Sequence, residues 1–100
     1  SGPEHVNSDQ LWNELQRMHR AALMLETELR RGQLDDGLIE EMETMLANGI
    51  GYDVRSQSLR DRLDALRETL LTPRPHRTMD GVRSCQELKH AIQTVMSGLR

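Results

Sequence analysis

The sequence predicts an all-α protein, an antiparallel helical bundle of three to four helices with near-heptad packing. Apolar residues recur at alternating spacings of four and three along the chain, which places them on one face of a helix. Aromatic residues are almost absent, with one Trp, one Tyr and no Phe, so Leu and Met must fill the core. Leu and Met keep their rotamer freedom in helices, and residues that favour strands are scarce.

The first helix is expected at 9–31. Asn7, Ser8 or Asp9 can act as its N-cap, because their side-chain oxygens accept hydrogen bonds from the first free backbone amides. Gly32 follows two arginines and is typical of the position just after a helix. The apolar stripe keeps an a/d pattern over nearly three heptads and consists of Leu11, Leu15, Met18, Ala22, Leu25 and Leu29.

The second helix is expected at 35–48. It begins with Asp35 and Asp36, which the positive end of a helix dipole favours. Asn48 and Gly49 are expected to end it, because a glycine commonly follows the last helical turn. Its apolar residues are Leu38, Ile39, Met42, Met45 and Leu46.

The third helix is expected at 54–72, with Asp53 or Ser56 as its N-cap. Two prolines just after it should end it, since each removes a backbone donor and restricts the residue before it. Charges of both signs alternate on its outer face, which is typical of a solvated surface. Its stripe consists of Leu59, Leu63, Leu66 and Leu70.

The fourth helix is expected at 84–98, after an irregular loop at 73–83. The run Ser84-Cys85-Gln86-Glu87 fits a capping box, in which the glutamate side chain reaches back to the amide of the serine. A start at Asp80 is the alternative, and it would shorten the loop. The stripe of this helix consists of Cys85, Leu88, Ile92, Val95 and Leu99.

The length of 100 residues predicts one domain, which we place at 4–100 because residues 1–3 are typical of a cloning remnant. No segment resembles a membrane span or a signal peptide. The one cysteine excludes an internal disulfide framework. These features predict a domain of a larger intracellular protein in a reducing compartment, the cytoplasm or the nucleus.

The motifs of common enzymes are absent from the sequence, which has no nucleophile elbow, no phosphate-binding glycine loop and no Cys-x-x-Cys pair. Three residues, His76, Cys85 and His90, could be imagined as zinc ligands. Their spacing matches no common zinc site and a fourth ligand is missing. The sequence therefore predicts no enzyme, no metal and no cofactor.

The unequal lengths of the first two helices suggest a function. The first should be about 33 Å long and the second about 18 Å, so part of the first stripe would stay uncovered in an even bundle. An uncovered apolar stripe favours binding of a partner helix. The hypothesis is a non-enzymatic protein–protein interaction module, an adaptor or scaffold domain, whose partner contacts are Trp12, Leu15, Met18, Met24 and Leu25, with Arg17 and Arg20 as a polar rim.

Two alternatives remain open from the sequence. The first is homo-oligomerisation, with the first or the fourth helix as the seam of a dimer. The second is contact with nucleic acid or an anionic surface through the arginines of the predicted loop, Arg74, Arg77 and Arg83. The net charge of −3 and the absence of aromatic residues among these arginines disfavour nucleic acid.

The segment 38–63 combines a helix, a short apolar elbow at 49–54 and a second helix. It resembles the helical repeats in the PLU-1-like region of JARID-type histone demethylases, and the same elbow pattern occurs in spectrin-like and many other helical repeats. The resemblance covers about a quarter of the chain and implies only an all-helical fold. No functional residue is carried over from it.

Overall fold

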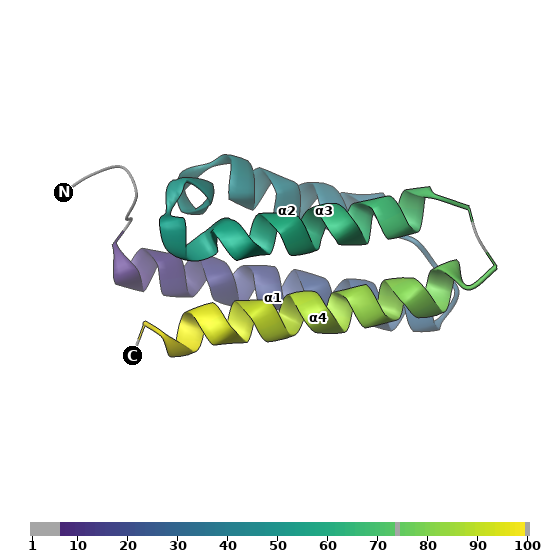
Figure 1. Ribbon diagram of the computed structural model, residues 1–100. Coiled ribbons are helices and arrows are strands. Elements are labelled where there is room, and N and C mark those ends of the chain that lie inside the picture. The colour runs from purple at the N-terminus through teal and green to yellow at the C-terminus, as the bar shows by residue number, and fades with distance from the viewer. Residues whose placement is uncertain (1–6, 74, 100) are drawn as a thin grey trace.

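The computed structural model describes residues 7–73 and 75–99. Regular structure in this part is entirely helical, which confirms the all-α fold class. The four α-helices run along one long axis, each turning back on the one before, in a molecule of 47 × 21 × 18 Å (Figure 1). In chain order the elements are α1 (Ser8–Arg30), α2 (Asp36–Ala47), the short 3-10 helices η1 (Gly49–Tyr52) and η2 (Val54–Ser56), α3 (Gln57–Leu71) and α4 (Arg77–Ser97).

The ends of α1 and the start of α2 follow the predicted capping residues. Asn7 Oδ1 accepts hydrogen bonds from the amides of Asp9 and Gln10, at 2.9 and 3.2 Å. Gly32 follows α1 with a φ of 76°, a backbone conformation that favours glycine. Asp35 caps α2 by accepting from the amide of Gly37 at 2.9 Å. Local side-chain chemistry therefore sets these boundaries.

The turn between α2 and α3 consists of η1 and η2, so the third α-helix begins at Gln57, later than the expected residue 54. Asp53 is fully buried in this turn and caps η2, with Oδ1 accepting from the amide of Arg55 at 2.9 Å. The guanidinium of Arg55 bonds both carboxylate oxygens of the same aspartate, at 2.9 and 2.7 Å. One buried carboxylate thus holds the chain in two tight turns in place of a continuous helix.

The start of α4 differs most from the expectation. The helix begins at Arg77, so the predicted irregular loop at 73–83 is wrong over its second half, and Ser84 lies inside the helix. The small residue Gly81 is buried where α4 meets α1 and α3, beside Leu29 and Leu70. Glycine at this position lets the backbones approach closely, and this packing extends the helix beyond the capping-box signal.

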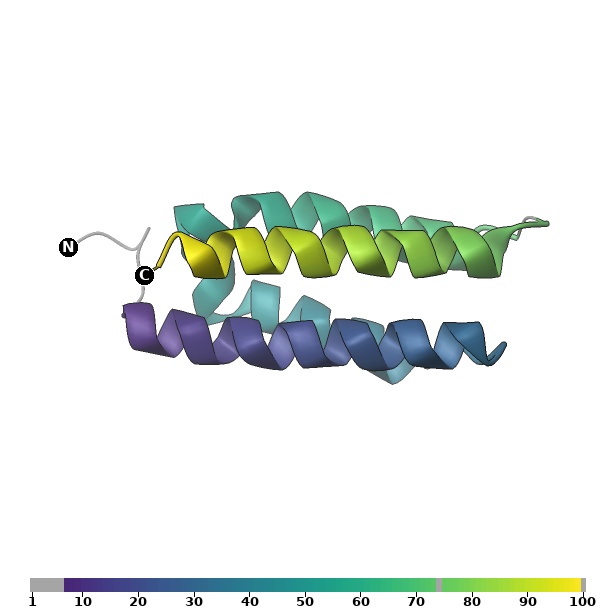
Figure 2. The same ribbon diagram turned by 90° about the horizontal axis from the view of Figure 1, so that it is seen from below.

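The early start of α4 has a direct consequence for α1. The two helices lie side by side along nearly their whole length, as both views show (Figures 1 and 2). The stripe of α1 is therefore covered by α4 as well as by α2, and the predicted surplus of uncovered stripe does not exist. One core cluster draws on all four helices, and its largest fully buried members are Leu11, Leu15, Met18, Leu25, Met42, Ile50, Leu59, Leu63, Leu66, Leu70, Leu88 and Ile92.

Candidate functional site

The outer face of α1, which we define by Arg20, Leu23 and Met24, carries exposed apolar side chains beside a cation. Leu23 and Met24 follow one another in the chain and are 45% and 50% exposed. Adjacent helical residues point about a quarter-turn apart, so the two side chains flank one ridge on opposite sides. Two large apolar side chains so exposed on one turn form the clearest candidate for a contact surface.

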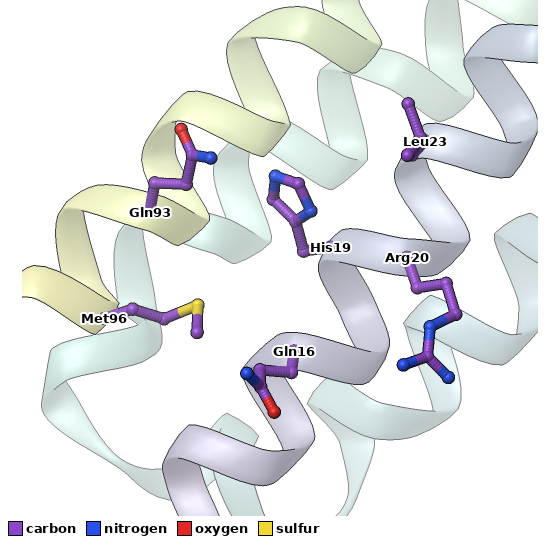
Figure 3. A pocket seen from close by; sticks show the side chains of 6 residues that line it. All are labelled: Gln16, His19, Arg20, Leu23, Gln93 and Met96. Atoms are coloured by element: carbon purple, nitrogen blue, oxygen red, sulfur yellow. The ribbon is translucent and has the colours of Figure 1, made fainter.

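The α4 side of this ridge is hollowed. The α1–α4 hollow has a volume of about 360 Å³ and is lined by Gln16, His19, Arg20, Leu23, Gln93 and Met96. Figure 3 shows His19 and Met96 reaching into the space between the two helices from opposite sides. Arg20 extends along the other flank of α1 in the same view. The hollow is therefore a surface groove lined by two apolar side chains, two glutamine amides, an imidazole and one arginine.

The α2 side of the ridge carries a second, smaller hollow. This α1–α2 hollow has a volume of about 90 Å³ and is lined by Arg17, Arg20, Ala21, Met24 and Glu41. Arg17 is bonded to Glu14 at 2.9 Å and lies 4.0 Å from Glu41 across the helices. Arg20 lines both hollows. Arg20 thus stands on the ridge, and its guanidinium extends over the side of α1 that faces away from α4 (Figure 3).

A buried carboxylate, Glu26, connects α1 and α4 through an ion pair. Glu26 is 7% exposed, and its oxygens lie 2.6 Å from Lys89 Nζ and 2.9 Å from Arg30 Nη2. Burial would raise the pKa of Glu26, but the hydrogen bonds and charges of the two cations outweigh it and lower the pKa below 4.5. Glu26 therefore stays ionised at neutral pH and holds Lys89 against α1.

Two titratable side chains near this pair are kept neutral. Burial, and then the positive charge of Lys89, lower the pKa of His19 from 6.5, so its imidazole is mainly uncharged at neutral pH. Burial and the negative charge of Glu26 raise the pKa of Cys85 to about 12, so its sulfur remains a thiol. A buried thiol is a poor nucleophile, and Cys85 acts here as a small core residue.

The structure separates the seven predicted partner contacts into three groups by their exposure. Leu15, Met18 and Leu25 are fully buried, so the prediction that they contact a partner is wrong, because α4 covers the stripe to which they belong. Trp12 is half-buried at the start of α1. The exposed members, on or beside the ridge, are Arg17, Arg20 and Met24.

The predicted basic loop is not a loop. Arg77 is the first residue of α4, and its Nη1 donates to the carbonyl oxygen of Leu70 at 3.5 Å. Arg83 lies exposed within the same helix, and Arg74 falls outside the described residues. The described arginines of this set are thus ordinary positions on a helix.

Sequence reasoning missed most of the α1–α4 hollow. Its residues on α1 lie at the same spacing as the core stripe, shifted by one position, and include Gln16, His19 and Leu23. Gln93 and Met96 repeat this shift on α4. This second stripe could have indicated the hollow from the sequence. Two glutamines and a histidine make it more polar than the core stripe, so its periodicity is hard to recognise.

Comparison with known proteins gives no information about the function of the chain. No family model, curated protein or solved structure matches the chain. The resemblance of the segment 38–63 to repeat proteins therefore gains no support. Among the described residues, no cluster of three or more side chains could hold a metal ion. No helix in the same part of the chain is both long and apolar enough to cross a membrane.

Proposed function

We propose that this chain is a non-enzymatic protein–protein interaction module, an antiparallel bundle with near-heptad packing that binds a partner helix or peptide on the outer face of α1. The observation that carries the proposal is the adjacent exposure of Leu23 and Met24, with a hollow on each side. Their neighbours on α1 are buried in the core, so folding does not account for these two positions.

The surface geometry supports a helix in a groove as the mode of binding. The α1–α4 hollow lies between two helices that are aligned along their length (Figure 2). The two helices have their backbone groups paired internally and offer no open edge to an extended strand. A helix satisfies its own backbone and needs only side-chain contacts, so it suits such a surface.

Affinity capture with matched variants tests the proposal. Leu23→Ser combined with Met24→Ser removes the apolar ridge at exposed positions, so helicity should remain while capture of the partner is lost. The control combines Leu34→Ser and Met79→Ser, which are 42% and 71% exposed and lie away from α1's ridge. The control should capture the same partner as the parent chain. Equal capture by the ridge variant would overturn the proposal.

Sedimentation of the parent chain over a concentration series distinguishes the alternative of homo-oligomerisation. We expect a monomer throughout, because a module that binds another protein needs the ridge to be free. A dimer that the ridge variant dissociates would make a second copy the occupant of this face, and would replace the proposal with self-association.

A further inference from the structure

The charged residues that line the α1–α4 hollow are of one sign. None of its six lining residues is acidic. Arg20 is exposed and forms no ion pair within residues 7–73 and 75–99. The neighbouring Arg17 is neutralised by Glu14. Arg20 is therefore an uncompensated cation beside the apolar side chain of Leu23.

The titratable groups around Arg20 do not pair with it, and Glu41, which lines the α1–α2 hollow with Arg20, lies 4.0 Å from Arg17 instead. Lys89 Nζ and Glu26 Oε1 lie 2.6 Å apart and compensate one another, with the carboxylate almost fully buried. His19 adds hydrogen-bonding capacity without a full charge at neutral pH, since its pKa is lowered. The groove thus offers an approaching chain two apolar contacts and two glutamine amides, and the ridge beside it carries one free positive charge.

We propose that the occupant of the α1–α4 hollow is an acidic amphipathic helix of another protein. Its Leu or Met side chains contact Leu23 and Met96, and an Asp or Glu on its flank pairs with Arg20. The inference rests on the proposed function and adds the chemistry of the partner. A basic helix would bring its cations against Arg20 with no carboxylate in the lining to offset them.

A second copy of this chain does not fit that description. Its acidic helix is α2, which carries four acids and no Lys or Arg. The large apolar residues of α2 are all buried in the chain's own core, so α2 cannot present them to another copy. A membrane surface fits poorly as well, because the apolar contacts are confined to a groove between two helices. The observations therefore favour a separate protein partner.

Titration of the full chain with two helical peptides tests this inference. Both peptides carry the same stripe of Leu residues, and their flanking positions are all Glu in one and all Lys in the other. In ¹H–¹⁵N spectra the Glu peptide should shift the amide signals of Arg20, Leu23, Gln93 and Met96. Arg20→Glu should weaken binding of the Glu peptide about fivefold, the upper range for an exposed ion pair, and should strengthen binding of the Lys peptide.

Arg83→Glu is the matched control, because it makes the same change in charge at an exposed position of α4 outside the hollow. It should leave both affinities within about twofold of the parent value, as expected for a distant exposed charge. Thermal unfolding of each variant checks that the fold is retained. Equal effects of the two substitutions would overturn the role of Arg20.

The remaining outcomes separate the inference from the function on which it rests. If the Lys peptide binds the hollow as tightly as the Glu peptide, the acidic partner is wrong while a helix-binding face remains. If neither peptide shifts signals from this face, the proposed function fails too. If phosphatidylserine vesicles shift these signals and the Glu peptide does not, the occupant is a lipid surface and the inference is overturned.

Discussion

At the scale of single residues, Glu26 shows how a charge can be buried between two helices. The folded chain lowers the pKa of this carboxyl through Lys89 and Arg30, although burial acts in the opposite direction. A pKa that is lower in the folded state contributes stability above 4.5, and this contribution is lost as the pH falls through the folded value. The pair thus favours the folded state at neutral pH.

Glu26→Gln should lower the free energy of unfolding at neutral pH by about 1 kcal/mol, because it replaces a doubly paired carboxylate with a neutral amide. The difference from the parent chain should shrink as the pH falls below 4.5. Urea unfolding at a series of pH values measures it. Glu68→Gln, at an exposed position of α3, is the control and should show little difference at any pH. If Glu26→Gln lowers the free energy of unfolding by the same amount at every pH, the effect does not come from the charge of the carboxylate.

Gly51 and Gly81 each lie close to other atoms of the chain, Gly51 to backbone and Gly81 to side chains. Replacing them with alanine should therefore lower the free energy of unfolding by different amounts. A Cβ at Gly51 would lie 1.3 Å from the carbonyl oxygen of Leu46, so the backbone must move. A Cβ at Gly81 would meet the side-chain ends of Leu70 and Leu29, at 2.6 and 3.1 Å, and these can shift.

Gly51→Ala should therefore lower the free energy of unfolding by about 2 to 3 kcal/mol, as overpacking does. Gly81→Ala should change it by less than about 1 kcal/mol, because the higher helix propensity of alanine offsets part of the clash. Denaturant unfolding of both variants checks the order. A larger loss for Gly81→Ala would show that the contact of α4 with α1 and α3 is the less adaptable of the two.

At the scale of elements, local signals predicted most helix boundaries. Asn7, Gly32 and Asp35 mark their boundaries through side-chain or backbone chemistry that lies within a few residues. The start of α4 depends on a distant contact, since Gly81 is placed against α1 and α3. A local pattern such as the box at Ser84 cannot reveal that contact, and a glycine in sequence suggests a break.

The turn between α2 and α3 depends on Asp53, whose carboxylate accepts three hydrogen bonds from Arg55. Asp53→Ala should lower the free energy of unfolding by about 2 to 3 kcal/mol, because it removes the acceptor of three hydrogen bonds from the partly buried Arg55. Asp61→Ala, at an exposed position of α3, is the control and should change stability by less than about 0.5 kcal/mol, as most surface substitutions do. Similar losses for both would mean that the carboxylate does not hold the turn.

At the scale of the whole molecule, the candidate site was only partly predictable. The sequence spacing places Met24 beside the a/d stripe of α1 rather than on it, and in the structure Met24 is half-exposed. The predicted contacts Leu15, Met18 and Leu25 are wrong for one reason, because α4 covers the length of α1 that the shorter α2 does not reach. Which helix covers which face is a property of the assembled molecule, and a list of helix lengths does not contain it.

The charge of the molecule is also uneven, with four acids and no base on α2 and acids and bases mixed on α3. We expect no saturable binding to duplex DNA tighter than about 10⁻⁴ M at physiological salt, the weak end of nonspecific binding. On each of α1, α3 and α4 acids accompany the bases, and these acids would repel the phosphates. Fluorescence anisotropy with a labelled duplex measures this. Saturable micromolar binding that Arg77→Glu with Arg83→Glu removes would restore the nucleic-acid alternative.

The start of α1 and the end of α4 lie at the same end of the molecule (Figure 1). Tension applied between these two points would pull the helices apart sideways and break their contacts one turn at a time, so little force is needed at any moment. The pair of Glu26 and Lys89, farther along α1, would part only after the α1–α4 hollow had opened. A partner helix bound across that hollow would connect α1 and α4 near the end where they begin to separate. It would therefore raise the force that is needed to pull α1 away from α4.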